Sequence, residues 1–191
     1  MSQTSLRTLP AARLRAINVA LVVAGSLLMA IGAHVAVHVP FSPVPITGQT
    51  LALPIVVALL GTRRSVAAML LYLAEGASGL PVFAPSTAPS VVALIGPTAG
   101  YLWSFPVAAY VIGALFDLGL GVRVAGRVVA IVAGEIVVFS LGAIWLAHFV
   151  GLERAVALGV APFVIGDLLK VSIAAAVGGS ASRLLPAIFR G

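Results

Sequence analysis

Apolar residues are gathered into six segments along the chain, and the stretches between the segments hold most of the prolines and arginines. The segments run approximately over residues 17–39, 51–61, 65–77, 99–118, 124–150 and 155–177. A helix needs about 20 mainly apolar residues to cross a bilayer, and apolar stretches recur here almost to the C-terminus. The pattern predicts an all-α integral membrane protein, a six-transmembrane-helix bundle that forms a single domain over residues 1–191.

Arginines between the segments predict which helix ends face the cytoplasm, because cytoplasmic loops carry an excess of Lys and Arg. With the N-terminus inside, only Arg154, beside Glu153, lies on the outer side. Six spans with both termini cytoplasmic satisfy this bias, and five spans do not. The arginines on the inner side are Arg7, Arg13, Arg15, Arg63, Arg64, Arg123, Arg127, Arg183 and Arg190.

The second and third segments are too short to cross a bilayer alone. Each has about 11–13 residues, under 20 Å of helix, against a hydrocarbon core of about 30 Å. Joining them would bury Arg63 and Arg64 at roughly 2.5–3.5 kcal/mol each, so we expect a hairpin with its tip inside. The flanking loops 40–50 and 79–98 are rich in Pro, Gly, Ser and Thr. Because irregular backbone at membrane depth must be buried or line a cavity, these loops are predicted to roof a cavity that opens outward.

Composition supports the membrane assignment and narrows the possible functions. Hydrophobic residues make up 61% of the chain and charged ones 8%, against roughly 25% charged in a soluble domain. The net charge of +6 comes from arginines scattered between apolar runs, which is typical of topology signals rather than of nucleic-acid binding. Cysteine is absent, which excludes disulfides and thiolate chemistry. The first apolar run is longer than the core of a secretory signal and is expected to be retained.

Asp167 and Lys170 are the most informative polar residues, because they lie well inside the sixth segment. Lys170 is the only lysine, and a spacing of three residues puts both side chains on one face of a helix. Ionisable groups inside a span are costly and usually face an internal cavity. Two interpretations stay open: an ion pair that only locks helix packing, or a pair of polar contacts for a small ligand.

Other polar residues are weaker candidates. Gln49 and Thr47, next to Thr50, end the first loop and could supply hydrogen bonds in an apolar pocket. A capping Thr and a solvated Gln are the alternative. Glu75, near the outer end of the third segment, is expected to be hydrated. The deeper Glu135 stays open between a packing residue, a ligand contact and a partner contact.

The first segment and the residue before it contain two further patterns, a pair of histidines and a ladder of alanines. His34 and His38 are four residues apart, a spacing that can hold a metal on one helical face, but no third ligand is fixed and no metal site is predicted. Ala16, Ala20 and Ala24 form a ladder of small residues, which lets helix backbones approach closely in lipid. The ladder is predicted either to pack within the bundle or to dock a membrane partner.

Four separated motifs, in order, resemble those of the BioY family, the substrate-binding subunits (S components) of biotin energy-coupling-factor (ECF) transporters. The similarity covers most of the chain. The motifs are Val44-Pro45-Ile46-Thr47-Gly48-Gln49-Thr50-Leu51-Ala52, Gly79-Leu80-Pro81-Val82-Phe83-Ala84, Gly96-Pro97-Thr98-Ala99-Gly100-Tyr101-Leu102 with Phe105-Pro106, and Gly166-Asp167-Leu168-Leu169-Lys170.

The resemblance implies a bundle that captures biotin at the outer face of a bacterial inner membrane. It also implies two kinds of partner, a transmembrane coupling (T) protein and ABC ATPase subunits. The chain has no Gly-x-x-x-x-Gly-Lys-Ser/Thr loop, so we expect no cofactor of its own and ATP use by the partner ATPases. The ladder of Ala16, Ala20 and Ala24 fits the face that docks the coupling protein in related subunits. Substrate contacts are expected at Asp167, Lys170, Gln49, Thr47, Phe83 and Tyr101.

Three alternatives to biotin capture are considered. An S component for another vitamin, such as thiamine or riboflavin, should have a more aromatic pocket than 7% aromatic residues provide. A membrane-embedded enzyme that uses Asp167, Glu75 or Glu135 would need an acid–base or metal arrangement, and none has convincing spacing. A structural membrane subunit would use its charges only to pack helices, and no small molecule would then stabilise it.

Overall fold

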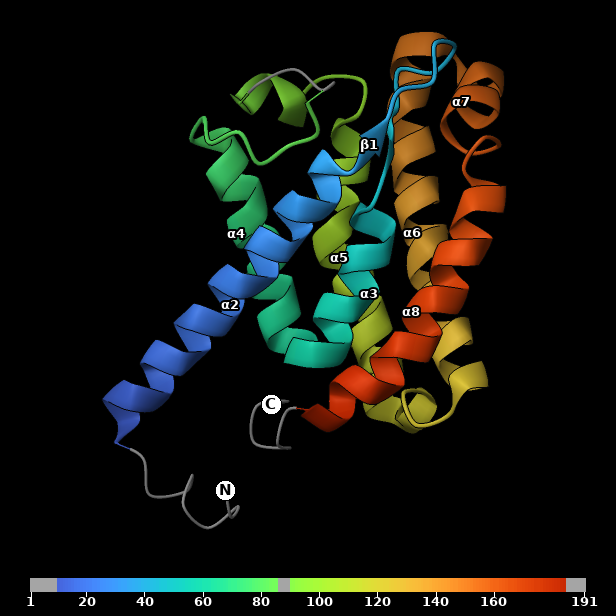
Figure 1. Ribbon diagram of the computed structural model, residues 1–191. Coiled ribbons are helices and arrows are strands. Elements are labelled where there is room, and N and C mark those ends of the chain that lie inside the picture. Colours follow the sequence, from blue (N-terminus) through green and yellow to red (C-terminus); the bar gives the residue numbers. More distant parts are fainter. Residues whose placement is uncertain (1–9, 86–89, 185–191) are drawn as a thin grey trace.

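In the computed structural model, which describes residues 10–85 and 90–184, the chain folds into a bundle of helices (Figure 1). The short helices α7 (Leu152–Gly159), η1 (a 3-10 helix, Ser90–Leu94) and η2 (a π-helix, Phe116–Leu120) connect the long ones. The long helices are α2 (Ala11–His34), α3 (Gln49–Leu60), α4 (Thr62–Ala77), α5 (Ala99–Leu115), α6 (Val124–Val150) and α8 (Val164–Leu184).

The prediction of a mainly helical fold is confirmed, and the loop between α2 and α3 adds a small antiparallel hairpin that was not predicted. Its strands are β1 (Ala36–Val37) and β2 (Ile46–Thr47), with Ala36 opposite Thr47. The hairpin shortens the first helix at its C-terminal end, which was predicted to continue to residue 39. It also pairs backbone groups of the connecting loop that would otherwise lack partners.

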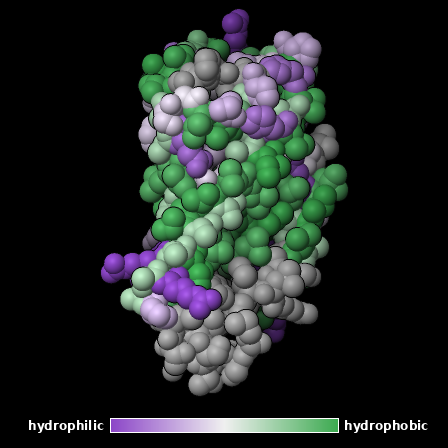
Figure 2. All heavy atoms as spheres, turned by 60° about the vertical axis from the view of Figure 1, so that its left-hand side comes forward, coloured by the Kyte–Doolittle hydropathy of each residue, from purple (hydrophilic) through white to green (hydrophobic). Residues whose placement is uncertain are grey.

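Three helical stretches among the described residues are long and apolar enough to cross a membrane, and α3 is a shorter apolar helix. The three are α2, α6 and the stretch Ala99–Leu120, which joins α5 and η2. Figure 2 shows a broad band of apolar side chains around the middle of one face, with polar residues toward the two ends. Apolar surface of this extent is stable against lipid and not against water, so the chain is a multi-pass membrane protein.

The two short segments are separate helices, as predicted. Only Gly61 lies between α3 and α4, and its φ of 76° is in the left-handed region that glycine adopts without a steric penalty. The buried Ser65 hydroxyl donates to the Gly61 carbonyl at 2.7 Å, which satisfies one of the acceptors at the end of α3. The turn therefore keeps Arg63 and Arg64 at one end of the bundle.

Successive helices reverse direction at alternate ends of the bundle (Figure 1). The start of α2, the α3–α4 turn, the α5–α6 connection and the end of α8 lie at the lower end in this view, and the β1–β2 hairpin and α7 lie at the upper end. The assignment of the lower end to the cytoplasm stays a prediction. Two of the arginines on which that prediction rests, Arg7 and Arg190, lie outside the described residues.

The sixth segment is divided, which corrects the predicted span over 155–177. α7 ends at Gly159, α8 begins at Val164, and Pro162 lies in the turn between them. Proline has no backbone N–H and disfavours a helical conformation of the residue before it. The break places Asp167 in the first turn of α8, where the helix dipole favours a carboxylate.

Buried apolar side chains form two clusters. The larger one lies mainly between α2, α3, α4 and α5 and includes the fully buried Met29, Leu53, Met69 and Tyr72. The smaller one joins α6 to α8 and consists of Ile131, Val171, Ala174 and Ala175.

Candidate ligand-binding site

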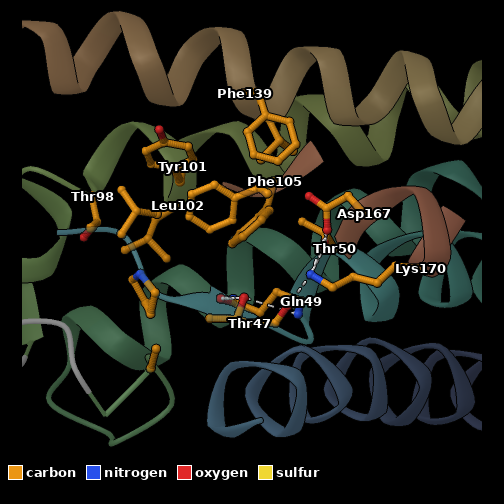
Figure 3. A pocket seen from close by; sticks show the side chains of 15 residues that line it. Thr47, Gln49, Thr50, Thr98, Tyr101, Leu102, Phe105, Phe139, Asp167 and Lys170 are labelled. Carbon is orange, nitrogen blue, oxygen red and sulfur yellow. Dashed lines mark hydrogen bonds and ion pairs between the residues drawn. The ribbon is translucent and has the colours of Figure 1, made fainter. Parts of the chain in front are cut away.

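A cavity lies between the loops at the hairpin end of the bundle and the helices α3, α5, α6 and α8 (Figure 3). The space between its lining atoms is about 570 Å³, counted with the part that is open to solvent. Val44, Pro45 and Thr47 come from the loop between α2 and α3, and Ala84 and Thr98 come from the loop between α4 and α5. The prediction that both loops border a cavity is therefore confirmed.

Asp167 and Lys170 both line this cavity and form an ion pair on α8. Lys170 Nζ lies 2.7 Å from Asp167 Oδ1, and the two side chains are 17% and 6% exposed. The second carboxylate oxygen, Asp167 Oδ2, is buried and has no hydrogen-bond partner in the described part of the chain. Because buried polar atoms are nearly always paired, a closed ion pair that only locks packing does not account for this oxygen.

Two threonines connect the ion pair to β2 and to the first turn of α3 (Figure 3). Lys170 Nζ donates to the Thr47 carbonyl at 2.9 Å and to Thr50 Oγ1 at 3.0 Å. The Thr50 hydroxyl in turn donates to Asp167 Oδ1 at 2.9 Å. These bonds join α8 to α3 and to β2 in the wall of the cavity. Thr50, noted in the sequence only as a neighbour of Gln49, is thus a direct partner of both charges.

Gln49 is buried at 4% exposure, so the interpretation of a solvated Gln is wrong. Its Nε2 donates to the Tyr72 hydroxyl at 3.0 Å, and its Oε1 accepts from Thr47 Oγ1 at 3.2 Å. Both Gln49 and Thr47 line the cavity, as predicted. The contact with Tyr72 of α4 orients the amide, and an oriented amide in an apolar wall is the kind of group that discriminates between ligands.

Tyr101 of α5 lines the cavity with its ring and is anchored by its hydroxyl. The hydroxyl donates to the Gly159 carbonyl at the end of α7, at 2.9 Å. The ring lies flat on Gly142 of α6, where a Cβ atom would be only 2.2 Å from the nearest ring carbon. Glycine at 142 therefore makes room for this ring.

Phe83 does not line the cavity, in contrast to the prediction made for it. Its ring covers Gly76 of α4 and meets Tyr72 edge-on, with ring centroids 5.3 Å apart. The motif around Phe83 nevertheless contributes to the site, because the next residue, Ala84, is part of the lining. Phe83 thus supports Tyr72, which holds Gln49, and acts behind the cavity wall.

The apolar wall was mostly missed by sequence reasoning, because aromatic residues on membrane helices are too common to single out. Phe105 of α5, Phe139 of α6 and Phe163, just before α8, all line the cavity. Phe139 and Phe163 lie with ring centroids 5.9 Å apart. Together with the Asp167–Lys170 pair, the wall suits a ligand with an apolar body and a few hydrogen-bonding groups.

The other candidate residues lie away from the lining. Glu75 is half-buried and accepts a hydrogen bond from Ser26 of α2 at 3.0 Å, so its expected hydration is only partial. No group of three potential metal ligands occurs in the part of the chain that the structure describes. The alanine ladder faces outward on α2, whereas the neighbouring Gly25 packs inward against α4, so internal packing does not explain the ladder. Its members are Ala16, Ala20 and Ala24.

Comparison with known proteins agrees with this geometry. The sequence model of the BioY family matches residues 3–187. The structure is similar to the crystal structure of an S component for biotin from an ECF-type ABC transporter, with a TM-score of 0.82 over 96% of this chain and 100% of that one. The two sequences are 20% identical, so this likeness concerns the fold.

Two relatives match over most of their length. A probable biotin transporter BioY from Pyrococcus horikoshii is 35% identical over 161 residues, which cover 84% of this chain and 93% of the relative. A biotin transporter BioY from Thermotoga maritima is 35% identical over 151 residues, which cover 78% and 86%. With the family model spanning nearly all of the sequence, these matches show that the chain belongs to the BioY family.

Proposed function

We propose that this protein captures biotin and carries it across the cell membrane as the substrate-binding S component of an ECF-type ABC transporter. The observation that carries the proposal is the buried Asp167–Lys170 pair, which lines an apolar cavity and leaves Asp167 Oδ2 without a partner among the residues that the structure describes. Membership of a family whose named relatives are biotin transporters supports biotin as the ligand.

The chemistry of biotin matches the cavity. Biotin has a ureido ring with two N–H donors and one carbonyl, an apolar thioether ring, and a carboxylated tail. The free oxygen of Asp167 accepts a ureido N–H, and Lys170 holds a carbonyl or the carboxylate. Phe105, Phe139 and Phe163 cover the apolar ring. Burial of polar ligand groups is favourable only when each one finds a partner, and this site offers an acceptor and a cation within one helical turn.

The protein works with partners rather than as an enzyme. A transmembrane coupling protein docks on the outward face of α2 formed by Ala16, Ala20 and Ala24, because small residues let a second helix approach closely. ABC ATPase subunits supply the energy, and this chain needs no cofactor of its own. In the membrane we place six spans with both termini cytoplasmic, so that the loops over the cavity face outward.

Titration of biotin into the purified full-length protein tests the proposal. We expect saturable binding that is weakened roughly tenfold to a hundredfold by Asp167→Asn and by Lys170→Ala, since each loses a charge-assisted hydrogen bond worth about 1.5–3 kcal/mol. Glu153→Gln, on the exposed start of α7, is the control and should bind as the native protein does. Absence of biotin binding by the native protein contradicts the proposal.

A further inference from the structure

We propose that Glu135 of α6 is a second carboxyl contact for the ligand, and that it acts with Asp167 to receive the two N–H groups of a cyclic urea. This inference rests on the proposed function and concerns how the same site recognises its ligand. Three observations carry it: the place of Glu135 on its helix, the donors of Lys170, and the unpaired carboxyl oxygens.

Glu135 lies on the side of α6 that faces the cavity and α8. Residues three and four apart share a face of a helix, and Val138 and Phe139 both line the cavity. One turn in the other direction, Ile131 packs against Val171 in the α6–α8 cluster. Glu135 therefore lies on α6 between the lining residues Val138 and Phe139 and the α6–α8 cluster, next to the lining of the cavity but not part of it. It interacts electrostatically with both charges of the α8 pair.

In the ligand-free protein, none of the Lys170 donors has Glu135 as its partner. An ammonium group has three N–H donors, and here they face Asp167 Oδ1, the Thr47 carbonyl and Thr50 Oγ1. The region around the α8 pair thus combines two carboxyl groups with one cation whose donors face Asp167, Thr47 and Thr50, and a ligand group that Lys170 holds must replace one of these acceptors. A second carboxyl group in such a place is costly unless another group bonds to it.

The unpaired carboxyl oxygens indicate that the ligand supplies this group. Among the described residues, the buried side-chain atoms without a hydrogen-bond partner are Asp167 Oδ2, Glu135 Oε2 and Glu75 Oε2. Glu75 also has an unpaired oxygen, but it lies away from the lining of the cavity, and its other oxygen accepts a hydrogen bond from Ser26 of α2. Since buried acceptors are nearly always satisfied, the two unpaired oxygens of Asp167 and Glu135 indicate a ligand that brings two donors.

A cyclic urea fits this requirement. Its two N–H groups point away from each other on either side of one carbonyl. Acceptors on two different helices, Asp167 on α8 and Glu135 on α6, can meet these two edges, whereas a single carboxylate cannot meet both. The arrangement also predicts selectivity, because a ligand that lacks one of the N–H groups leaves a buried carboxyl unpaired.

The test measures the Kd of biotin and of its two monomethyl analogues, each methylated at one ureido nitrogen, for the native protein and for Glu135→Ala. Glu75→Ala, a half-buried carboxyl outside the site, is the matched control. We expect Glu135→Ala to weaken biotin binding roughly tenfold to a hundredfold and Glu75→Ala to leave it unchanged. One analogue should bind the native protein more weakly than biotin does. The same analogue and biotin should bind Glu135→Ala with nearly equal affinity, because methylation and the substitution remove the same contact.

Two results overturn the assignment. If native protein and Glu135→Ala bind biotin equally, Glu135 does not contact the ligand. If methylation of either nitrogen raises the Kd by the same factor in the native protein and in Glu135→Ala, Glu135 only supports the fold. If the alanine variant does not fold, Glu135→Gln takes its place, because it keeps the shape of the side chain and one acceptor. We expect Glu135→Gln to weaken biotin binding by roughly three- to tenfold. Failure of the native protein to bind biotin instead overturns the proposed function, and this inference with it.

Discussion

Removal of the lysine from the buried ion pair gives a sharp test of how the α8 charges are stabilised. Lys170→Met keeps the length and the apolar stem of the side chain but removes the charge and its three donors. Asp167, whose side chain is 6% exposed, then keeps only the Thr50 hydroxyl as a partner. Breaking a buried pair by removal of one member costs about 3–5 kcal/mol, because the remaining charge is uncompensated.

The double variant Asp167→Asn/Lys170→Met separates this effect from the loss of side-chain packing. With both charges gone, no uncompensated charge remains, and replacement of a buried ion pair by neutral groups is often close to neutral. We therefore expect the double variant to be more stable than Lys170→Met alone. Arg154→Met, which removes an exposed cation on α7, should change the stability by less than about 0.5 kcal/mol.

Unfolding of the ligand-free protein by SDS in mixed micelles, followed by the fluorescence of its two tryptophans, measures these differences. The expected order of stability is the native protein, then the double variant, then Lys170→Met. If Lys170→Met is as stable as the double variant, Asp167 is not left uncompensated by the change. The argument that Lys170 balances a buried carboxylate would then be wrong.

Two further changes test how the helices position the site. Gly142→Ala puts a methyl group into the ring of Tyr101, so we expect weaker biotin binding in a titration, while Gly166→Ala, where an added methyl group meets nothing, should have no such effect. Arg127→Met removes the buried guanidinium that donates to the Ala175 carbonyl of α8, and we expect a loss of about 2–4 kcal/mol in the same SDS unfolding assay with biotin affinity retained. A weakened affinity of the folded Arg127→Met protein would contradict a purely structural role.

Much of the helix pattern was predictable because the bilayer constrains it so strongly. The two apolar runs around Arg63 and Arg64 are each too short to span the bilayer. A helical hairpin is the arrangement that keeps both arginines out of the hydrocarbon core, and the break at Gly61 agrees with it. The division between α7 and α8 was missed although Pro162 signals it, because the apolar run continues through the proline. The β1–β2 hairpin was missed because strands of two residues leave no periodic pattern.

The site was predictable in part. Asp167 and Lys170 stand out in any reading, since charges inside an apolar segment are rare and their spacing places them on one face. Phe83 was predicted as a substrate contact because its motif resembles one of the family, but its ring covers Gly76 and is not part of the lining. Nothing in the sequence separates a residue that lines a cavity from its neighbour when both are apolar and belong to the same loop.

The sequence by itself determined that the protein is embedded in a membrane and roughly which residues form its long helices. It also determined that a charge pair lies within the last of these helices. These properties depend on hydrophobicity and spacing along one helix. Only the tertiary structure decided which partners those charges have. Thr50 between Asp167 and Lys170, and Glu135 beside them, come from other helices. Contacts across the bundle depend on how helices rotate and cross, and packing of the whole chain sets those angles.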